Sequence, residues 1–225
     1  MNWVDFFIAV VLILAVVIGY KRGLFRELTT FAGLIIAVVV SVNYADWMAL
    51  KAENLINIAP TLRYVLAFIV CFLGSMLVFK LIGYYFYKMV KLSKLGMSDK
   101  LGGAVFGAMK GLVVLSLLFL MFIFLPVFQS FNQSIDESAM APVIRQFVPT
   151  AYDYTEYFHP ESGDFVSNVT AGVLGSQATQ YAKKPESLLS DENPLGFSLD
   201  DLRVLNNLDK YFSDNIAVAT EGADK

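Results

Sequence analysis

Six ionisable residues lie within or beside long apolar stretches of the sequence, where a charge is costly and therefore informative. They are Arg22, Arg26, Glu27, Lys80, Asp99 and Lys110. Opposite charges cost less in a low-dielectric interior when they are paired than when they are separate. We therefore expect a charged cluster at the inner ends of membrane helices. Three roles are compatible with it: ion pairs that hold helices together, a site for gating or ligand binding, and lysines that snorkel to the lipid headgroups.

Glycines at a spacing of four residues accompany these charges. Gly103, Gly107 and Gly111 form a doubled G-x-x-x-G pattern, which is typical of close contacts between membrane helices. At 3.6 residues per turn, Lys110 lies on the same helical face. Gly33 belongs to a similar stripe of small and polar residues on an earlier segment. The pattern predicts either plain helix packing or a polar site inside the helix assembly.

Sequence motifs for catalysis, metal binding or cofactor binding are missing. The single histidine, His159, has no second ligand at metal-binding spacing, and the single cysteine, Cys71, lies in an apolar segment. No nucleophile elbow, phosphate-binding loop or dinucleotide fingerprint occurs. We therefore expect no enzyme, no catalytic residue, no cofactor, no metal and no nucleic-acid partner.

The composition divides the chain into a basic apolar part and an acidic polar part. Hydrophobic residues make up 56% of the 225 residues and charged residues only 16%. Residues 1–128 carry 11 Lys/Arg against 5 Asp/Glu, whereas residues 129–225 carry 6 against 15. This split predicts a membrane domain followed by a segment in water.

Four segments of the first part are long enough to cross a bilayer, which takes about 20 apolar residues in a helix. They cover about 3–20, 24–43, 62–87 and 101–128. Helices are required because unpaired backbone groups are too costly in lipid. The predicted fold is thus all-α, with a four-helix transmembrane domain over 1–128. Asp99 is expected to cap the fourth helix.

The distribution of Lys and Arg predicts how the helices are oriented. Two connections are rich in these residues and are placed in the cytoplasm by the positive-inside rule. Their basic residues are Lys21, Arg22 and Arg26 in the first, and Lys88, Lys91, Lys94 and Lys100 in the second. The protein is then a multi-pass protein of the bacterial inner membrane with both termini in the periplasm.

The second part of the chain divides again. Residues 129–160 contain short apolar runs interrupted by Pro142 and Pro149, and we expect amphipathic pieces at the outer membrane surface. Residues 161–225 are expected to form an acidic flexible tail, with a linker over about 162–193 and a short helix at about 198–212.

Two motifs resemble the colicin V production protein family (CvpA) over roughly residues 1–160. The first is Arg22-Gly23 followed by Arg26-Glu27, and the second runs from Asp99-Lys100-Leu101-Gly102 into Phe106-Gly107-Ala108-Met109-Lys110-Gly111. Lys100 and Lys110 stand where the family often has Arg. A lysine keeps the positive charge but cannot form the bidentate pair with a carboxylate that an arginine forms.

The resemblance implies an inner-membrane protein that supports production or export of a peptide toxin and homeostasis of the cell envelope. We expect an accessory or scaffold protein that acts through helix association at its glycines. Its expected partners are the lipid bilayer, further copies of itself, and other membrane or export proteins. The alternative is a small channel or transporter with a charged cytoplasmic vestibule.

Overall fold

The computed structural model describes residues 2–52, 58–89, 96–125, 129–155, 157, 163–174, 203–208 and 210–212. These residues form helices and connections and include no strand, so the predicted all-α fold is confirmed. The four long helices are α1 (Trp3–Arg22), α2 (Leu24–Ala52), α3 (Pro60–Met89) and α4 (Met97–Phe124). Within the described part of the chain, these four are long and apolar enough to cross a membrane, with mean hydropathies of 2.5, 1.9, 2.6 and 2.2.

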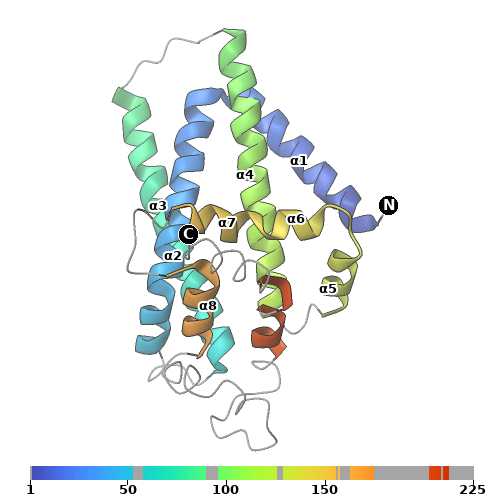
Figure 1. The fold of residues 1–225 in the computed structure, drawn as a ribbon. Helices are drawn as coiled ribbons and strands as arrows, with labels where there is room; N and C mark the ends of the chain where they lie inside the picture. Colours follow the sequence, from blue (N-terminus) through green and yellow to red (C-terminus); the bar gives the residue numbers. More distant parts are fainter. Residues whose placement is uncertain are drawn as a thin grey trace, which may run out of the picture.

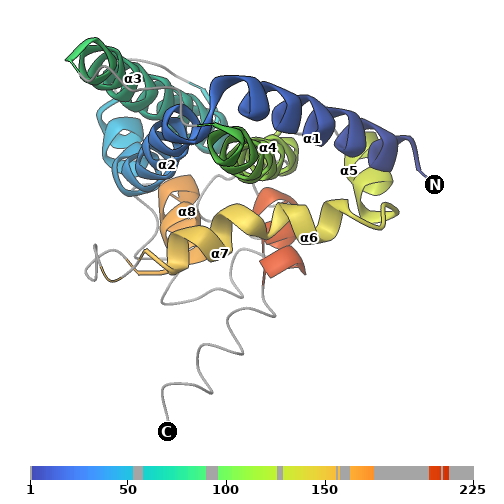
Figure 2. The same cartoon turned by 90° about the horizontal axis from the view of Figure 1, so that it is seen from above.

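The long helices stand in a row. Helix α1 packs on α4, α4 packs on α2, and α2 packs on α3, whereas α1 touches α2 and α3 touches α4 only slightly. Viewed along the helices, α1 and α3 lie at opposite ends of the row (Figure 2). Large apolar side chains on α1 and α3 are exposed along most of their length. In a membrane, lipid would cover these faces.

Helix α2 is nine residues longer than its predicted apolar span. The predicted segment ended near residue 43, but the buried stripe continues through Val42, Ala45 and Ala49. This spacing keeps one face of the helix against the rest of the protein. Asp46 and Lys51 lie in the same extension, where hydropathy alone predicts a loop. Tertiary packing therefore extends the helix beyond its apolar stretch.

Short helices cover one face of the row near one end. They are α5 (Gln129–Asp136), α6 (Ala141–Arg145), α7 (Phe147–Asp153) and α8 (Phe165–Leu174). Helices α6 and α7 run across the long helices (Figure 1). Their junction is held by the buried Ser116 of α4. Its hydroxyl donates to the carbonyl of Arg145 at 3.0 Å and accepts from the amide of Val148 at 3.0 Å.

Residues 165–174 differ from the predicted linker, because they form α8. Phe165, Val169 and Val173 of this helix are buried in the main apolar core, and Gly172 lies against the ring of Tyr64 on α3. The Ser-, Gly- and Asn-rich composition suggested a linker, yet the apolar residues recur at helical spacing. Residues 163–164 precede this helix, and the rest of the predicted linker, 162 and 175–193, lies outside the described residues.

The predicted helix at 198–212 overlaps the described residues 203–208 and 210–212, and all of these described residues are helical. Val204, Leu208 and Phe212 are buried in the same core as α2, α3, α4 and α8. Residues 198–202 lie outside the described part. We call α5–α8 together with residues 203–212 the cap.

A hydrogen-bond chain joins the cap to α2 and gives a first prediction. The hydroxyl of Tyr152 donates to Oδ1 of Asn43 at 2.6 Å and accepts from Nδ2 of Asn168 at 3.1 Å. Tyr152→Phe removes both bonds and leaves the half-buried acceptor of Asn43 without this donor, so we expect a loss of about 1 kcal/mol in the free energy of unfolding. Chemical unfolding of the purified protein measures it. The exposed Tyr154→Phe is the control, and equal stability of the two variants would contradict the prediction.

Candidate functional site

The connection between α1 and α2 is a tight turn at Gly23. Its φ of +85° favours glycine, and its amide donates to the carbonyl of Gly19 at 3.0 Å. Across the turn, Oδ1 of Asp99 accepts from the amide of Leu24 at 2.9 Å. Asp99 therefore caps the start of α2 and not that of α4, contrary to expectation. A carboxylate at a helix N-terminus satisfies a free amide and opposes the helix dipole.

The side chain of Glu27, one turn into α2, is the buried centre of the charged cluster. It is 0% exposed. Lys110 of α4 donates to Oε2 of Glu27, and NH1 of Arg22 lies 3.4 Å from Oε1. The side chain of Lys110 is itself only 17% exposed. Two cations therefore neutralise one buried carboxylate at the junction of α1, α2 and α4.

The other two residues of the predicted cluster, Arg26 and Lys80, are not part of the buried contact between Glu27, Lys110 and Arg22. Arg26 and Lys80 are both exposed. Lys80 lies on α3 and makes no ion pair with any described residue. The predicted basic loop at Lys91 and Lys94 lies outside the described residues, as does the side chain of Lys88.

The glycine stripe of α4 packs against α1 of the same chain. A Cβ added at Gly107 would lie 2.5 Å from the carbonyl oxygen of Ala15, and one added at Gly111 would lie 2.8 Å from the Ala15 Cβ. Gly103 and Gly19 face each other even more closely. Helix α1 of the same chain therefore occupies this surface, which agrees with the first of the two alternatives, plain helix packing.

Two further glycines, Gly33 and Gly19, also lie at close contacts between helices. Gly33 packs α2 against α3, since a Cβ there would lie 3.0 Å from the Cβ of Phe79. Sequence reasoning missed Gly19. The signal was present, because Ala15, Gly19 and Gly23 repeat every four residues and match the stripe on α4.

The inner cluster can hold helices together but leaves no free acid or base at Glu27. The carboxylate has no contact with solvent and has two cationic partners. No group of three or more His, Cys, Asp or Glu side chains that could hold a metal occurs among the residues with described positions.

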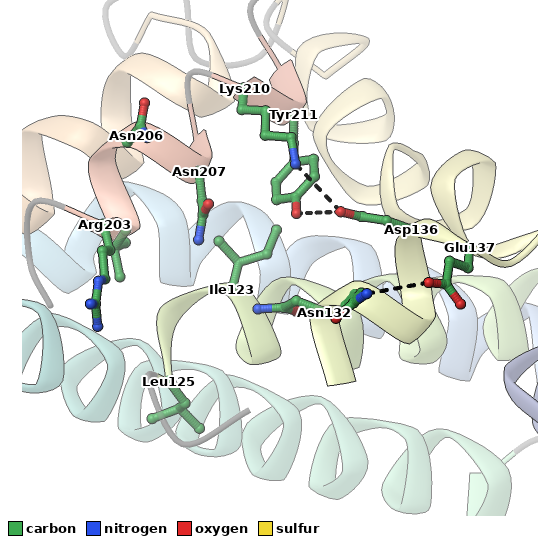
Figure 3. Close-up of a pocket in the computed structure, with 12 residues that line it drawn as sticks. Ile123, Leu125, Asn132, Asp136, Glu137, Arg203, Asn206, Asn207, Lys210 and Tyr211 are labelled. Atoms are coloured by element: carbon green, nitrogen blue, oxygen red, sulfur yellow. Dashed lines mark hydrogen bonds and ion pairs between the residues drawn. The ribbon is translucent and has the colours of Figure 1, made fainter. Parts of the chain in front are cut away.

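A cavity of about 490 Å³ lies instead in the cap, between the end of α4, α5 and the helix at 203–211 (Figure 3). Its lining combines four amide side chains, charges of both signs, one tyrosine and apolar residues. The amides are Asn132, Gln133, Asn206 and Asn207; the charged residues are Asp136, Glu137, Arg203 and Lys210; the tyrosine is Tyr211. None of these residues stood out in the sequence, since none belongs to a recognisable motif.

Asp136 organises one wall of this cavity. It accepts from NH1 of Arg145 at 3.1 Å and from the hydroxyl of Tyr211 at 2.7 Å. The guanidinium of Arg145 also lies 3.7 Å from the centre of the Tyr211 ring. Burial, followed by the bond to Asp136, raises the pKa of Tyr211, so its hydroxyl remains a donor at neutral pH. These contacts fasten the helix at 203–212 to α5 and α6.

The N-terminal end of α1 is tied to the cap as well. Oδ1 of Asp5 accepts from the Ser138 hydroxyl at 2.5 Å, and Nδ2 of Asn2 donates to the Ser134 carbonyl at 2.6 Å. Asp5 thus connects the first membrane helix to the α5–α6 turn. The cap is held by α1, α2 and α4 at once, so it forms one body with the membrane helices.

Four apolar helices with internally paired charges and a folded cap define a polytopic α-helical membrane protein. The sequence model of the family described as colicin V production protein matches residues 4–149. The chain belongs to that family, which confirms the resemblance found in the sequence. Searches of curated proteins and of solved structures returned no match. The match includes Glu27, Asp99, Lys110, Asp136 and Arg145; α8 and the helix at 203–212 follow it.

Proposed function

We propose that the protein is a non-enzymatic scaffold of the bacterial inner membrane, in which the membrane helices support a partner-binding cap in the periplasm. The family match supports a role in production of a toxin, and the proposal adds export of the toxin and maintenance of the envelope. The orientation is supported by the basic residues Lys21, Arg22 and Lys100, which lie at the end of the helices opposite the cap.

One contrast carries this proposal. The charges between the membrane helices neutralise one another, with Glu27 fully buried between Lys110 and Arg22, whereas the cap holds a cavity of about 490 Å³ that is lined by polar groups. Interacting groups that are still available for a partner therefore lie in the cap. A channel with a cytoplasmic vestibule needs an open polar path at Glu27, which the ion pairs fill.

The experiment fills the cavity in cells. In a host strain without its own copy of the gene, we expect wild-type protein to restore toxin secretion and envelope integrity. Asn206→Trp, on the exposed wall of the cavity, should fail to restore them at an equal level of protein in the membrane. Gln146→Trp, an exposed amide outside the cavity, is the matched control and should behave as wild type.

The same strains separate the scaffold from the channel. Full activity of Asn206→Trp in cells would overturn the proposal. Ion conduction by the purified protein in liposomes, with an ion selectivity that differs in Lys110→Ala, would also overturn it and would favour the channel.

A further inference from the structure

We propose that the cap cavity binds a short extended segment of polypeptide, through hydrogen bonds between its side-chain amides and the main chain of the ligand. This inference rests on the proposed function, because it names the chemistry of the partner that the cap would bind. The cavity lies between α4, α5 and the helix at 203–211, and its volume of about 490 Å³ is within the usual range of ligand sites (Figure 3).

A buried acceptor without a partner points to a ligand. Asn132 lines the cavity and is only 8% exposed. Its Nδ2 donates to the carbonyl of Phe122 at 3.0 Å, but its Oδ1 has no hydrogen-bond partner among the residues that the structure describes. Buried polar atoms in folded proteins are nearly always paired, and an unpaired one is costly. A molecule that brings an N–H or O–H donor into the cavity would satisfy it.

The remaining walls match the main chain of a peptide. The side chains of Asn206 and Asn207 each offer both a donor and an acceptor, as does every peptide unit. Gln133 already donates to Oε1 of Glu137 at 3.4 Å and keeps its carbonyl oxygen as an acceptor. Leu125, which is partly exposed, supplies apolar surface for a side chain of the ligand. Alternating donors, acceptors and apolar patches are what an extended chain presents on its own surface.

Two other ligand classes fit less well. Sugars commonly stack on an open aromatic face. Tyr211 is the aromatic residue among the described lining residues, and its ring is contacted by Arg145 at 3.7 Å and by Lys210 at 4.8 Å. Phosphates and nucleotides need an excess of positive charge. Here two acidic and two basic residues line the cavity, and Asp136 already pairs with Lys210 at 3.6 Å.

The test measures binding to the purified full-length protein in lipid nanodiscs. The probe is a library of tetrapeptides with acetylated and amidated ends, in which one position at a time is fixed, followed by the best single peptide. We expect saturable binding of that peptide. Asn206→Trp should raise its Kd at least about tenfold by filling the cavity, whereas Gln146→Trp should leave it within about twofold.

A second variant tests the acceptor itself. Asn132→Leu removes Oδ1 and should also weaken binding about tenfold, provided that its circular dichroism and elution volume match those of wild type. If this variant does not fold, the same peptide with its central amide N-methylated takes its place. The methyl group removes the donor from the ligand, and the expected loss of binding is the same.

Three outcomes would overturn the inference: no peptide in the library binds; binding is unchanged in Asn206→Trp; or tri-N-acetylglucosamine binds in place of the peptides and is displaced from the cavity by the tryptophan. A further comparison separates this inference from the proposed function. If Asn206→Trp abolishes function in cells but no peptide binds in nanodiscs, the proposed scaffold function is retained and the proposed peptide ligand is rejected. If the variant is fully active in cells, the proposed function falls as well.

Discussion

Lys110→Met is expected to lower the free energy of unfolding by about 3–5 kcal/mol, which is the usual effect of removing one partner of a buried ion pair. The substitution keeps most of the apolar volume of the side chain but removes the charge. Glu27 then remains fully buried with Arg22, which is half-exposed, as its remaining cation at 3.4 Å. Reversible unfolding in mixed detergent micelles, followed by circular dichroism, measures the change.

The chain offers a matched control for this experiment. Lys80 lies on α3, is exposed, and pairs with no described acid, so Lys80→Met should change the free energy by less than about 0.5 kcal/mol. The double variant Glu27→Gln with Lys110→Met should recover most of the loss, because neither charge remains to be desolvated. Similar stabilities of Lys110→Met and Lys80→Met would show that the pair does not hold α2 to α4.

Gly107→Leu is expected to prevent the packing of α1 on α4. A Cβ at this position would lie 2.5 Å from the carbonyl oxygen of Ala15 and 3.0 Å from the Cα of Gly19. Both neighbours are backbone atoms, which cannot rotate away as a side chain would, so the two helices must separate. Overpacking costs about 1–3 kcal/mol when side chains can adjust, and more is expected here.

Gly74→Leu is the control for this variant. Gly74 lies on α3, and no atom lies within 4 Å of a Cβ added there, so leucine should be tolerated. Cysteines placed at Ile8 of α1 and Leu115 of α4, which are buried in the same apolar cluster, should be joined efficiently by a short bifunctional thiol reagent when Gly107 is unchanged. We expect crosslinking to be lost in Gly107→Leu and retained in Gly74→Leu. Retained crosslinking in both would show that α1 does not pack on this stripe.

The sequence indicated that Gly107 and Lys110 are important, but it did not indicate which residues they contact. Gly107 and Lys110 stood out because glycine spacing and intramembrane charge are local signals. The sequence did not say whether the glycines meet α1 or a second chain, or which acid Lys110 pairs with. The same holds for Asp99. It accepts a hydrogen bond from the amide of Leu24, which lies 75 residues earlier in the chain, and the sequence does not indicate this partner.

The cap was the least predictable part. Ser116, Asn132, Asp136 and Arg145 belong to no motif, and their importance arises from contacts that the short helices make with α4 and with one another. Residues 165–174 illustrate why composition misleads in such regions. Their serine and glycine suggest a linker, whereas four apolar side chains buried in the core, Phe165, Val169, Val173 and Leu174, hold them in a helix.

The sequence alone determined that four segments are long and apolar enough to cross lipid, that they are helices, that basic residues gather in the first part of the chain and acidic residues in the second, and to which family the chain belongs. These follow from local properties: the number of consecutive apolar residues, the lack of backbone partners in lipid, and short motifs. Only the tertiary structure decided the order of helices in the row, the partners of each buried charge, and the cavity of the cap. Those depend on contacts between distant residues, whose side chains can pair in many ways until packing selects one.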